Sequence, residues 1–176
     1  MSDVRAALAA AAIKAAHEYA FCDFAELEFS DAVNAACREN VCGMYGRHWT
    51  CPPGVGTAAE NREKYSRFHS VFIFTTVHEV ASYGDTAAVD RSREAHRETE
   101  KVFLQILAQT PHALLGAGAC NLCKACTYPD APCRFPERAQ TAVEAVGIDV
   151  LRLANRLQLR SRNGENTITW FSLLLY

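Results

Sequence analysis

Four cysteines lie within a short stretch of this chain, and their spacing suits a metal site. Cys120, Cys123 and Cys126 follow one another with two residues between them, and Cys133 comes after six more. Thiolates spaced in this way can converge on one soft metal centre while the amide N–H groups of the loop point at its sulfides. The run therefore predicts bound metal, and the group that it suits best is a cubane 4Fe-4S cluster.

Zinc and unligated structural thiols are the alternatives for this quartet. Zinc also takes four cysteines, but usually through two separated Cys-x2-Cys pairs, whereas here three ligands follow in a row. Bacterial ferredoxins place their fourth cysteine after three residues and put proline behind it, whereas here Pro132 precedes Cys133. We expect Pro129 and Pro136 to stiffen the segment around the fourth ligand, and Arg134 to offset part of a cluster's negative charge.

A second group of cysteines lies upstream and is incomplete as a ligand set. Cys37, Cys42 and Cys51 are separated by four and eight residues, and the last of them begins the rigid sequence Cys-Pro-Pro-Gly. A cluster held by three cysteines leaves one iron open, and an open metal position is what substrate chemistry needs. His48 or Cys22 would be a fourth ligand, although we interpret His48 as structural and Cys22 as a buried apolar thiol. The alternatives to a separate second cluster are a zinc site, no metal, or one site shared by both loops.

The bulk composition is that of one globular domain without a strongly charged target. The chain has 176 residues, 49% of them hydrophobic, so residues 1–176 can build a core that does not depend on metal alone. The net charge of −2 gives no field that would draw the chain to nucleic acid or to a membrane surface. The sequence has no signal peptide and no run of about 18 apolar residues. We therefore expect a single metal-binding domain in the cytoplasm, with reduced thiols.

The apolar patterns predict alternating helices and strands. The predicted helices are residues 3–20, 58–68, 90–109 and, with a break near Gly147, 136–157. The predicted strands are residues 24–30, 71–77, 113–119 and 168–176. The run 71–77 is apolar throughout, which is typical of a strand buried on both faces. These elements predict an α/β sandwich, with α+β as the alternative: a small mixed sheet of about four strands, flanked by helices, with two projecting cysteine-rich loops.

Other polar residues gave weaker signals. The charged stretch RSREAHRETE, residues 91–100, predicts a helix face that lies in water, with His96 on it. Asp149, two residues after Gly147, is expected to cap the last helix. The sequence contains no phosphate-binding loop, dinucleotide fingerprint or serine-nucleophile motif.

The two cysteine motifs resemble those of an uncharacterised prokaryotic family described as predicted metal-binding proteins. The first motif is Cys37-x4-Cys42-x2-Tyr45-Gly46-x2-Trp49-x-Cys51-Pro52-Pro53. The second is Gly118-x-Cys120-x2-Cys123-x2-Cys126-x6-Cys133-Arg134-x-Pro136, followed by Glu144-Ala-x-Gly147-Ile-Asp149. The resemblance covers most of the chain and implies that the metal ligands are Cys37, Cys42, Cys51, Cys120, Cys123, Cys126 and Cys133. It leaves Cys22 outside the pattern, and Arg47 stands where lysine is expected. The family description names no reaction.

The leading hypothesis is an iron–sulfur protein that acts in electron transfer or redox chemistry with a partner protein. No general acid or base is identifiable, which favours electron transfer over catalysis. One alternative is an enzyme that uses an open iron of the three-cysteine cluster on a small-molecule substrate, with Arg47, Trp49 and Arg134 lining the pocket. The other is a zinc-binding structural or interaction module.

Overall fold

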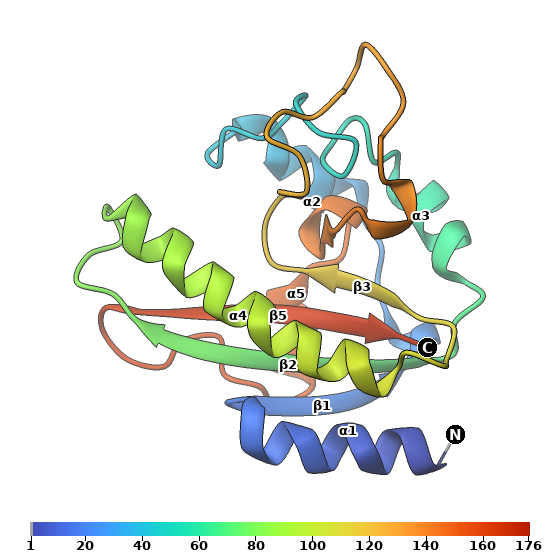
Figure 1. The fold of residues 1–176 in the computed structure, drawn as a ribbon, viewed down its shortest axis with the longest axis vertical. Coiled ribbons are helices and arrows are strands. Elements are labelled where there is room, and N and C mark those ends of the chain that lie inside the picture. Colours follow the sequence, from blue (N-terminus) through green and yellow to red (C-terminus); the bar gives the residue numbers. More distant parts are fainter. Residues whose placement is uncertain (1) are drawn as a thin grey trace.

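The computed structural model describes residues 2–176, and in this range the chain forms one mixed sheet between two layers of helices (Figure 1). The strands are β1 (Glu18–Asp23), β2 (Ser70–Glu79), β3 (Ala113–Gly116), β4 (Thr141–Ala142) and β5 (Thr167–Leu175). Their order across the sheet is β1-β2-β5-β3-β4. The first four strands in this order are antiparallel neighbours, and β4 runs parallel to β3. The expected mixed α/β architecture is confirmed, with five strands in the described residues where about four were predicted.

Each face of the sheet carries its own hydrophobic core. The helices are α1 (Ser2–Ala15), α2 (Asp31–Ala36), α3 (Ala58–Tyr65), α4 (Thr86–Ile106) and α5 (Val150–Arg156). Phe72 and Phe74 of β2 pack with side chains of α1 and α4, whereas Val71 and Ile73 pack on the opposite face with α5. A strand that is buried on both faces has no polar alternation, and for this reason residues 71–74 are all apolar and the following Thr75 and Thr76 are buried too.

The prediction of one helix over residues 3–20 is wrong in its second part. The helix α1 ends at Ala15, and the following Glu18–Asp23 forms β1, with Tyr19 opposite Phe74 and Phe21 opposite Phe72 of β2. The predicted strand over residues 24–30 is also wrong, because Phe24–Glu26 forms a 3-10 turn. Only an isolated bridge between Phe29 and Ile148 remains of that strand.

The segment before the last strand is less helical than predicted. In chain order, residues 136–157 contain the 3-10 turn η3 (Pro136–Arg138), the short strand β4, the 3-10 turn η4 (Glu144–Val146) and the helix α5. The expected cap is confirmed, because the Asp149 carboxylate accepts a hydrogen bond of 3.0 Å from the backbone N–H of Arg152. Gly147 has a φ of 92°, and a Cβ there would lie 2.7 Å from Oδ1 of Asn34, so this turn requires glycine.

Two irregular segments carry seven of the cysteines. We name residues 37–57 the upstream loop, which begins with the 3-10 turn η2 (Cys37–Glu39), and residues 117–135 the downstream loop, which follows β3. The two loops lie beside each other at the top of Figure 1, where they are coloured cyan and orange. Segments that are about eighty residues apart in the sequence are thus brought to the same end of the molecule.

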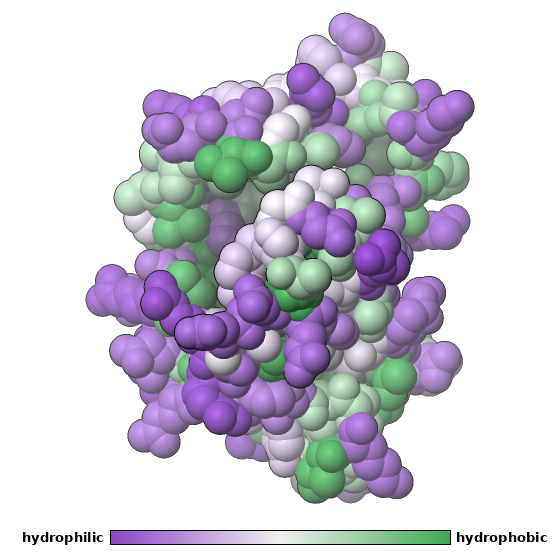
Figure 2. Space-filling model, turned by 90° about the vertical axis from the view of Figure 1, so that its left-hand side faces the viewer, coloured by the Kyte–Doolittle hydropathy of each residue, from purple (hydrophilic) through white to green (hydrophobic). Residues whose placement is uncertain are grey.

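The surface carries no large apolar band in the view of Figure 2, where hydrophilic residues cover most of the face and hydrophobic ones form small separate spots. The most exposed apolar side chains, among them Ile13, Val41, Tyr83 and Leu151, belong to four different segments. Within residues 2–176, no helix combines the length and the apolar character that crossing a bilayer requires.

Candidate metal centre

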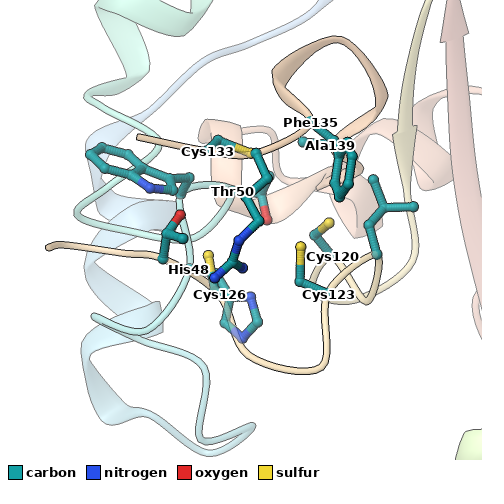
Figure 3. A pocket seen from close by; sticks show the side chains of 12 residues that line it. His48, Thr50, Cys120, Cys123, Cys126, Cys133, Phe135 and Ala139 are labelled. Carbon is teal, nitrogen blue, oxygen red and sulfur yellow. The ribbon is translucent and has the colours of Figure 1, made fainter. Parts of the chain in front are cut away.

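The four cysteines of the quartet line one cavity. Cys120, Cys123, Cys126 and Cys133 all contribute to its wall, together with residues of the upstream loop. Figure 3 shows the sulfur atoms of Cys120 and Cys123 next to each other on one side, with Cys126 and Cys133 placed around the remaining space. None of the four forms a disulfide, and all are partly exposed at the cavity. A cavity with four thiols in its wall fits a soft metal centre.

The thiols surround a space and do not meet at a point. Within residues 2–176, no three Cys, His, Asp or Glu side chains are close enough together to share a single metal ion. A tetrahedral zinc site needs four sulfur atoms at about 2.3 Å from one centre, so the downstream loop would have to contract to form it. A four-iron cluster is several ångströms across, and the free volume between the four thiols is only about 20 Å³, so the loop would have to open to take it up.

Hydrogen bonds across the downstream loop fix its shape around the cavity. The Arg134 guanidinium donates to the carbonyl of Ala125 over 2.9 Å, which ties the segment of Cys133 to that of Cys126. The Thr127 hydroxyl donates to the carbonyl of Pro132 over 2.9 Å and closes the turn between the same two cysteines. Arg134 therefore holds positive charge at a wall where thiolates would be negative.

The upstream trio forms a second cluster of neighbouring thiols. The pKa of Cys51 is raised to about 11, first by burial and then by the nearby thiols of Cys42, Cys37 and Cys120. The pKa of Cys37 is also raised, first by burial and then by Cys42 and Glu144. Neighbouring thiolates repel one another, which is why each thiol makes the ionisation of the next one harder. A bound cation attracts all of them and lowers their pKa values, so such a group of thiols suits a cation. Cys51 belongs to the trio and also lies near Cys120 of the quartet.

The upstream loop packs directly on the downstream loop. The Trp49 indole N–H donates to the carbonyl of Ala131 over 3.0 Å, and its ring meets that of Tyr128 edge to face at 4.9 Å between centroids. A Cβ on Gly54 would lie 2.7 Å from the Tyr128 ring and 2.8 Å from the carbonyl of His48, so the close approach of the loops depends on glycine here.

The structure places some of the remaining predicted site residues at the thiol cavity and others away from it. Trp49 and Arg134 line the thiol cavity, whereas the exposed Arg47 is not part of its wall. His48 lines this cavity, and burial followed by the charge of Arg47 lowers its pKa, which keeps the imidazole neutral. Cys22 lies in β1 within the hydrophobic core, where burial raises its pKa to about 11, as expected for an apolar thiol.

Sequence reasoning gave no site role to Glu144, which the structure places near Cys37. Glu144 belongs to η4, which is joined to α2 by a hydrogen bond of 2.7 Å from the Asn34 amide to the carbonyl of Ala145. The only sequence signal was its position at the head of the segment Glu144-Ala-x-Gly147-Ile-Asp149.

The expectation that residues 91–100 present a face to water is wrong for four of their side chains, of which Ser92 is one. His96, Arg97 and Glu100 are buried, with exposed fractions of 0%, 6% and 1%. Arg97 donates to the carbonyl of Ala119 over 2.9 Å, one residue before Cys120. The backbone of Ala117 faces the Glu100 carboxylate. Helix α4 therefore supports the start of the downstream loop.

A larger open cleft adjoins the thiol cavity. It has a volume of about 840 Å³ and shares Trp49, Thr50, Cys133 and Ala139 with the wall of the cavity. The cations on its wall are Lys64, Arg67 and Arg138, and the carboxylates are Asp130 and Glu137. A volume of this size is typical of small-molecule sites, and one thiol of the quartet faces it.

Comparison with known proteins supports metal binding and gives no reaction. Neither the curated proteins nor the solved structures contain a match to this chain. A family model does match, over residues 20–176, and this range includes both cysteine loops and β1 to β5 except for the first two residues of β1. The chain therefore belongs to the uncharacterised family described as predicted metal-binding protein (DUF2284).

Proposed function

We propose that this protein is an iron–sulfur protein in which the quartet of the downstream loop holds a 4Fe-4S cluster and the upstream trio holds a second one. The observation that carries the proposal is the single cavity walled by Cys120, Cys123, Cys126 and Cys133. The bound cluster would supply one-electron redox chemistry. The membership in a metal-binding family supports the presence of metal, and the spacing of the four cysteines in the sequence supports a cluster over a single ion.

The residues around the cavity suit an electron-transfer site. Arg134 adds positive charge, and Trp49 and the upstream loop cover one side, so the loops control charge and solvent access, which set the potential of such a centre. The eight cysteines are free thiols in residues 2–176, and reduced thiols of this kind belong in the cytoplasm. We infer that the reaction partner is a one-electron redox protein.

Catalysis on a small molecule is the second candidate, and the cleft beside Cys133 favours it. The cleft is large enough for a metabolite-sized compound, and Lys64, Arg67 and Arg138 would favour one that carries negative charge. Cys37, Cys42 and Cys51 supply only three thiolates and would leave an iron open. None of the three lines the cleft, so that iron would have to reach the substrate from beside Thr50, which does line it.

The test is metal analysis on anaerobically purified protein, with cysteine variants as matched pairs. We expect brown protein that contains iron and acid-labile sulfide and is bleached by dithionite. Cys133→Ala should lose the iron of the quartet, whereas Cys22→Ala, which removes a buried thiol outside both loops, should keep all of it. Colourless protein with stoichiometric zinc would exclude both redox candidates and leave a structural zinc module.

A third variant separates two clusters from one shared site. Cys51→Ser should remove the iron of the upstream trio and leave that of the quartet, which is about half of the total if both are 4Fe-4S clusters. Loss of all the iron would instead support a shared site, in keeping with the position of Cys51 between Cys42 and Cys120.

A further inference from the structure

A chain of hydrogen bonds crosses the buried face between α4 and the sheet, outside both cysteine loops. Nε2 of His78 lies 2.8 Å from the Thr76 hydroxyl, which lies 2.8 Å from Nδ1 of His96. Nε2 of His96 lies 2.8 Å from the Ser172 hydroxyl, which donates to Oε1 of Glu100 over 2.6 Å. We name these five residues the Glu100 network.

Every hydrogen bond of the Glu100 network is donated in the direction of Glu100. Because Ser172 gives its only proton to Glu100, its oxygen must accept from Nε2–H of His96. Nδ1 of His96 is then an acceptor from Thr76, and the Thr76 oxygen accepts from Nε2–H of His78. Protonation of Glu100 would reverse every one of these bonds, so the chain has two complete arrangements.

One end of the Glu100 network is open to solvent and the other is sealed. His78 is partly exposed near the end of β2, whereas His96, Ser172 and Glu100 are buried. Oε2 of Glu100 has no hydrogen-bond partner within residues 2–176, and a buried carboxylate with an unpaired oxygen is costly. Desolvation accordingly raises the pKa of Glu100 and lowers that of His96 to about 3.

The groups that surround Glu100 and His96 belong to α4, β2, β5 and the start of the downstream loop. On α4, Arg97 favours the carboxylate and Glu94 opposes it, while His96 lies 3.8 Å from Oε1 and is neutral. From β2, His78 acts on His96 and makes its protonation harder. β5 contributes the neutral Ser172, and the start of the downstream loop contributes the backbone of Ala117.

The sealed end lies against the start of the downstream loop. A Cβ on Gly116 would lie 2.6 Å from Oε1 of Glu100, so the absence of a side chain lets the carboxylate approach this backbone. Arg97, one turn earlier on α4, holds the carbonyl of Ala119. Glu100 thus contacts the backbone of Gly116, only four residues before Cys120. A change of charge at Cys120 therefore arises close along the chain to the segment that the Glu100 carboxylate contacts.

We propose that the Glu100 network is a proton path, through which Glu100 takes up a proton when the quartet of the downstream loop gains an electron. This inference rests on the proposed iron–sulfur function. It adds proton coupling, which the cysteine ligands alone do not provide.

The balance of the step is one electron and one proton. The electron comes from a one-electron donor protein, and the proton enters from solvent at Nδ1 of His78. Nε2–H of His78 passes its proton to Thr76, Thr76 to His96, His96 to Ser172, and Ser172 to Glu100. Each N–H or O–H bond that breaks is replaced by one that forms, both histidines change tautomer, and oxidation returns the proton by the same route.

The first experiment measures the reduction potential of the anaerobic iron-loaded protein across a range of pH. With coupling, the equilibrium constant for reduction falls about tenfold for each pH unit between the two pKa values of Glu100, with the centre oxidised and reduced. Glu100→Gln should abolish this dependence, and Glu98→Gln, on the exposed side of the same helix, should keep it. A wild-type potential that does not change with pH overturns the proposal.

A second measurement needs no substitution at Glu100. Reduced-minus-oxidised infrared spectra of wild-type protein should show a protonated carboxyl band that shifts when glutamate is labelled with ¹³C. Thr76→Val removes the hydroxyl and keeps the side-chain shape, so the band should reach the same size at least about tenfold more slowly. The absence of this band in brown, redox-active protein refutes the proton path alone, whereas colourless protein refutes the iron–sulfur function.

Discussion

Acid should destabilise this protein through His96. The imidazole is fully buried, with Thr76 and Ser172 at its two nitrogens and the ring of Phe74 stacked at 5.3 Å. Its pKa falls from the ordinary 6.5 to about 3, chiefly through desolvation and then through the charges of His78 and Arg97. Between these two values the unfolded chain binds a proton that the folded chain excludes, so stability falls as the pH falls.

The magnitude follows from the size of this shift. Each unit corresponds to about 1.4 kcal/mol, so the full effect is on the order of 5 kcal/mol and is present in full only above the ordinary pKa of 6.5. Between about pH 7.5 and about pH 4.5, His96 should remove about 3 kcal/mol of unfolding free energy. Glu100 has the opposite sign, because its raised pKa gives stability that is lost as the pH rises.

Urea unfolding at both pH values, with equal metal content, tests this reasoning. His96→Gln should cost stability at neutral pH, because it disturbs two buried hydrogen bonds, but it should lose about 3 kcal/mol less than wild type on acidification. The control is His69→Gln, at an exposed position. If wild type and His96→Gln lose the same free energy, the imidazole does not stay neutral in the folded chain and the argument is refuted.

Three further predictions concern the loops and their supports. Glu144→Gln should weaken metal retention by the upstream trio, because it removes a carboxylate near Cys37, and chelator competition should show this beside an unchanged Glu165→Gln. Trp49→Phe should cost about 1 kcal/mol through the lost hydrogen bond to Ala131, and equal urea midpoints would contradict that contact. Asp149→Ala should cost about 1 kcal/mol through the lost cap of α5, measured by thermal unfolding.

The sequence predicted those parts of the fold that local patterns determine. The apolar runs gave β2 and β5, and the spacing of the quartet anticipated four thiols around one cavity. It did not give β1, because no glycine or proline separates Ala15 from Glu18 and the helical pattern continues through this segment. What makes Glu18–Asp23 a strand is its pairing with β2, more than fifty residues away.

The Glu100 network escaped prediction for a related reason. In sequence, His96 and Glu100 stand among charged residues, and such a stretch predicts a face in water. Their partners Thr76 and Ser172 lie 20 and 76 residues from His96, and only the packing of α4 on β2 and β5 brings them together. The proximity of Glu144 to Cys37 arises likewise from the contact of η4 with α2.

The contact of Trp49 with Tyr128 and Ala131 bears on the order in which the protein matures. Each loop is part of the surface on which the other packs, so a group bound by one loop holds the other loop in place, and a variant that keeps only one set of ligands should load that set more slowly but still fill it. Insertion of the first inorganic group should therefore speed insertion of the second. Half-loaded molecules should be scarce during reconstitution, even when iron is supplied below the amount that fills every site.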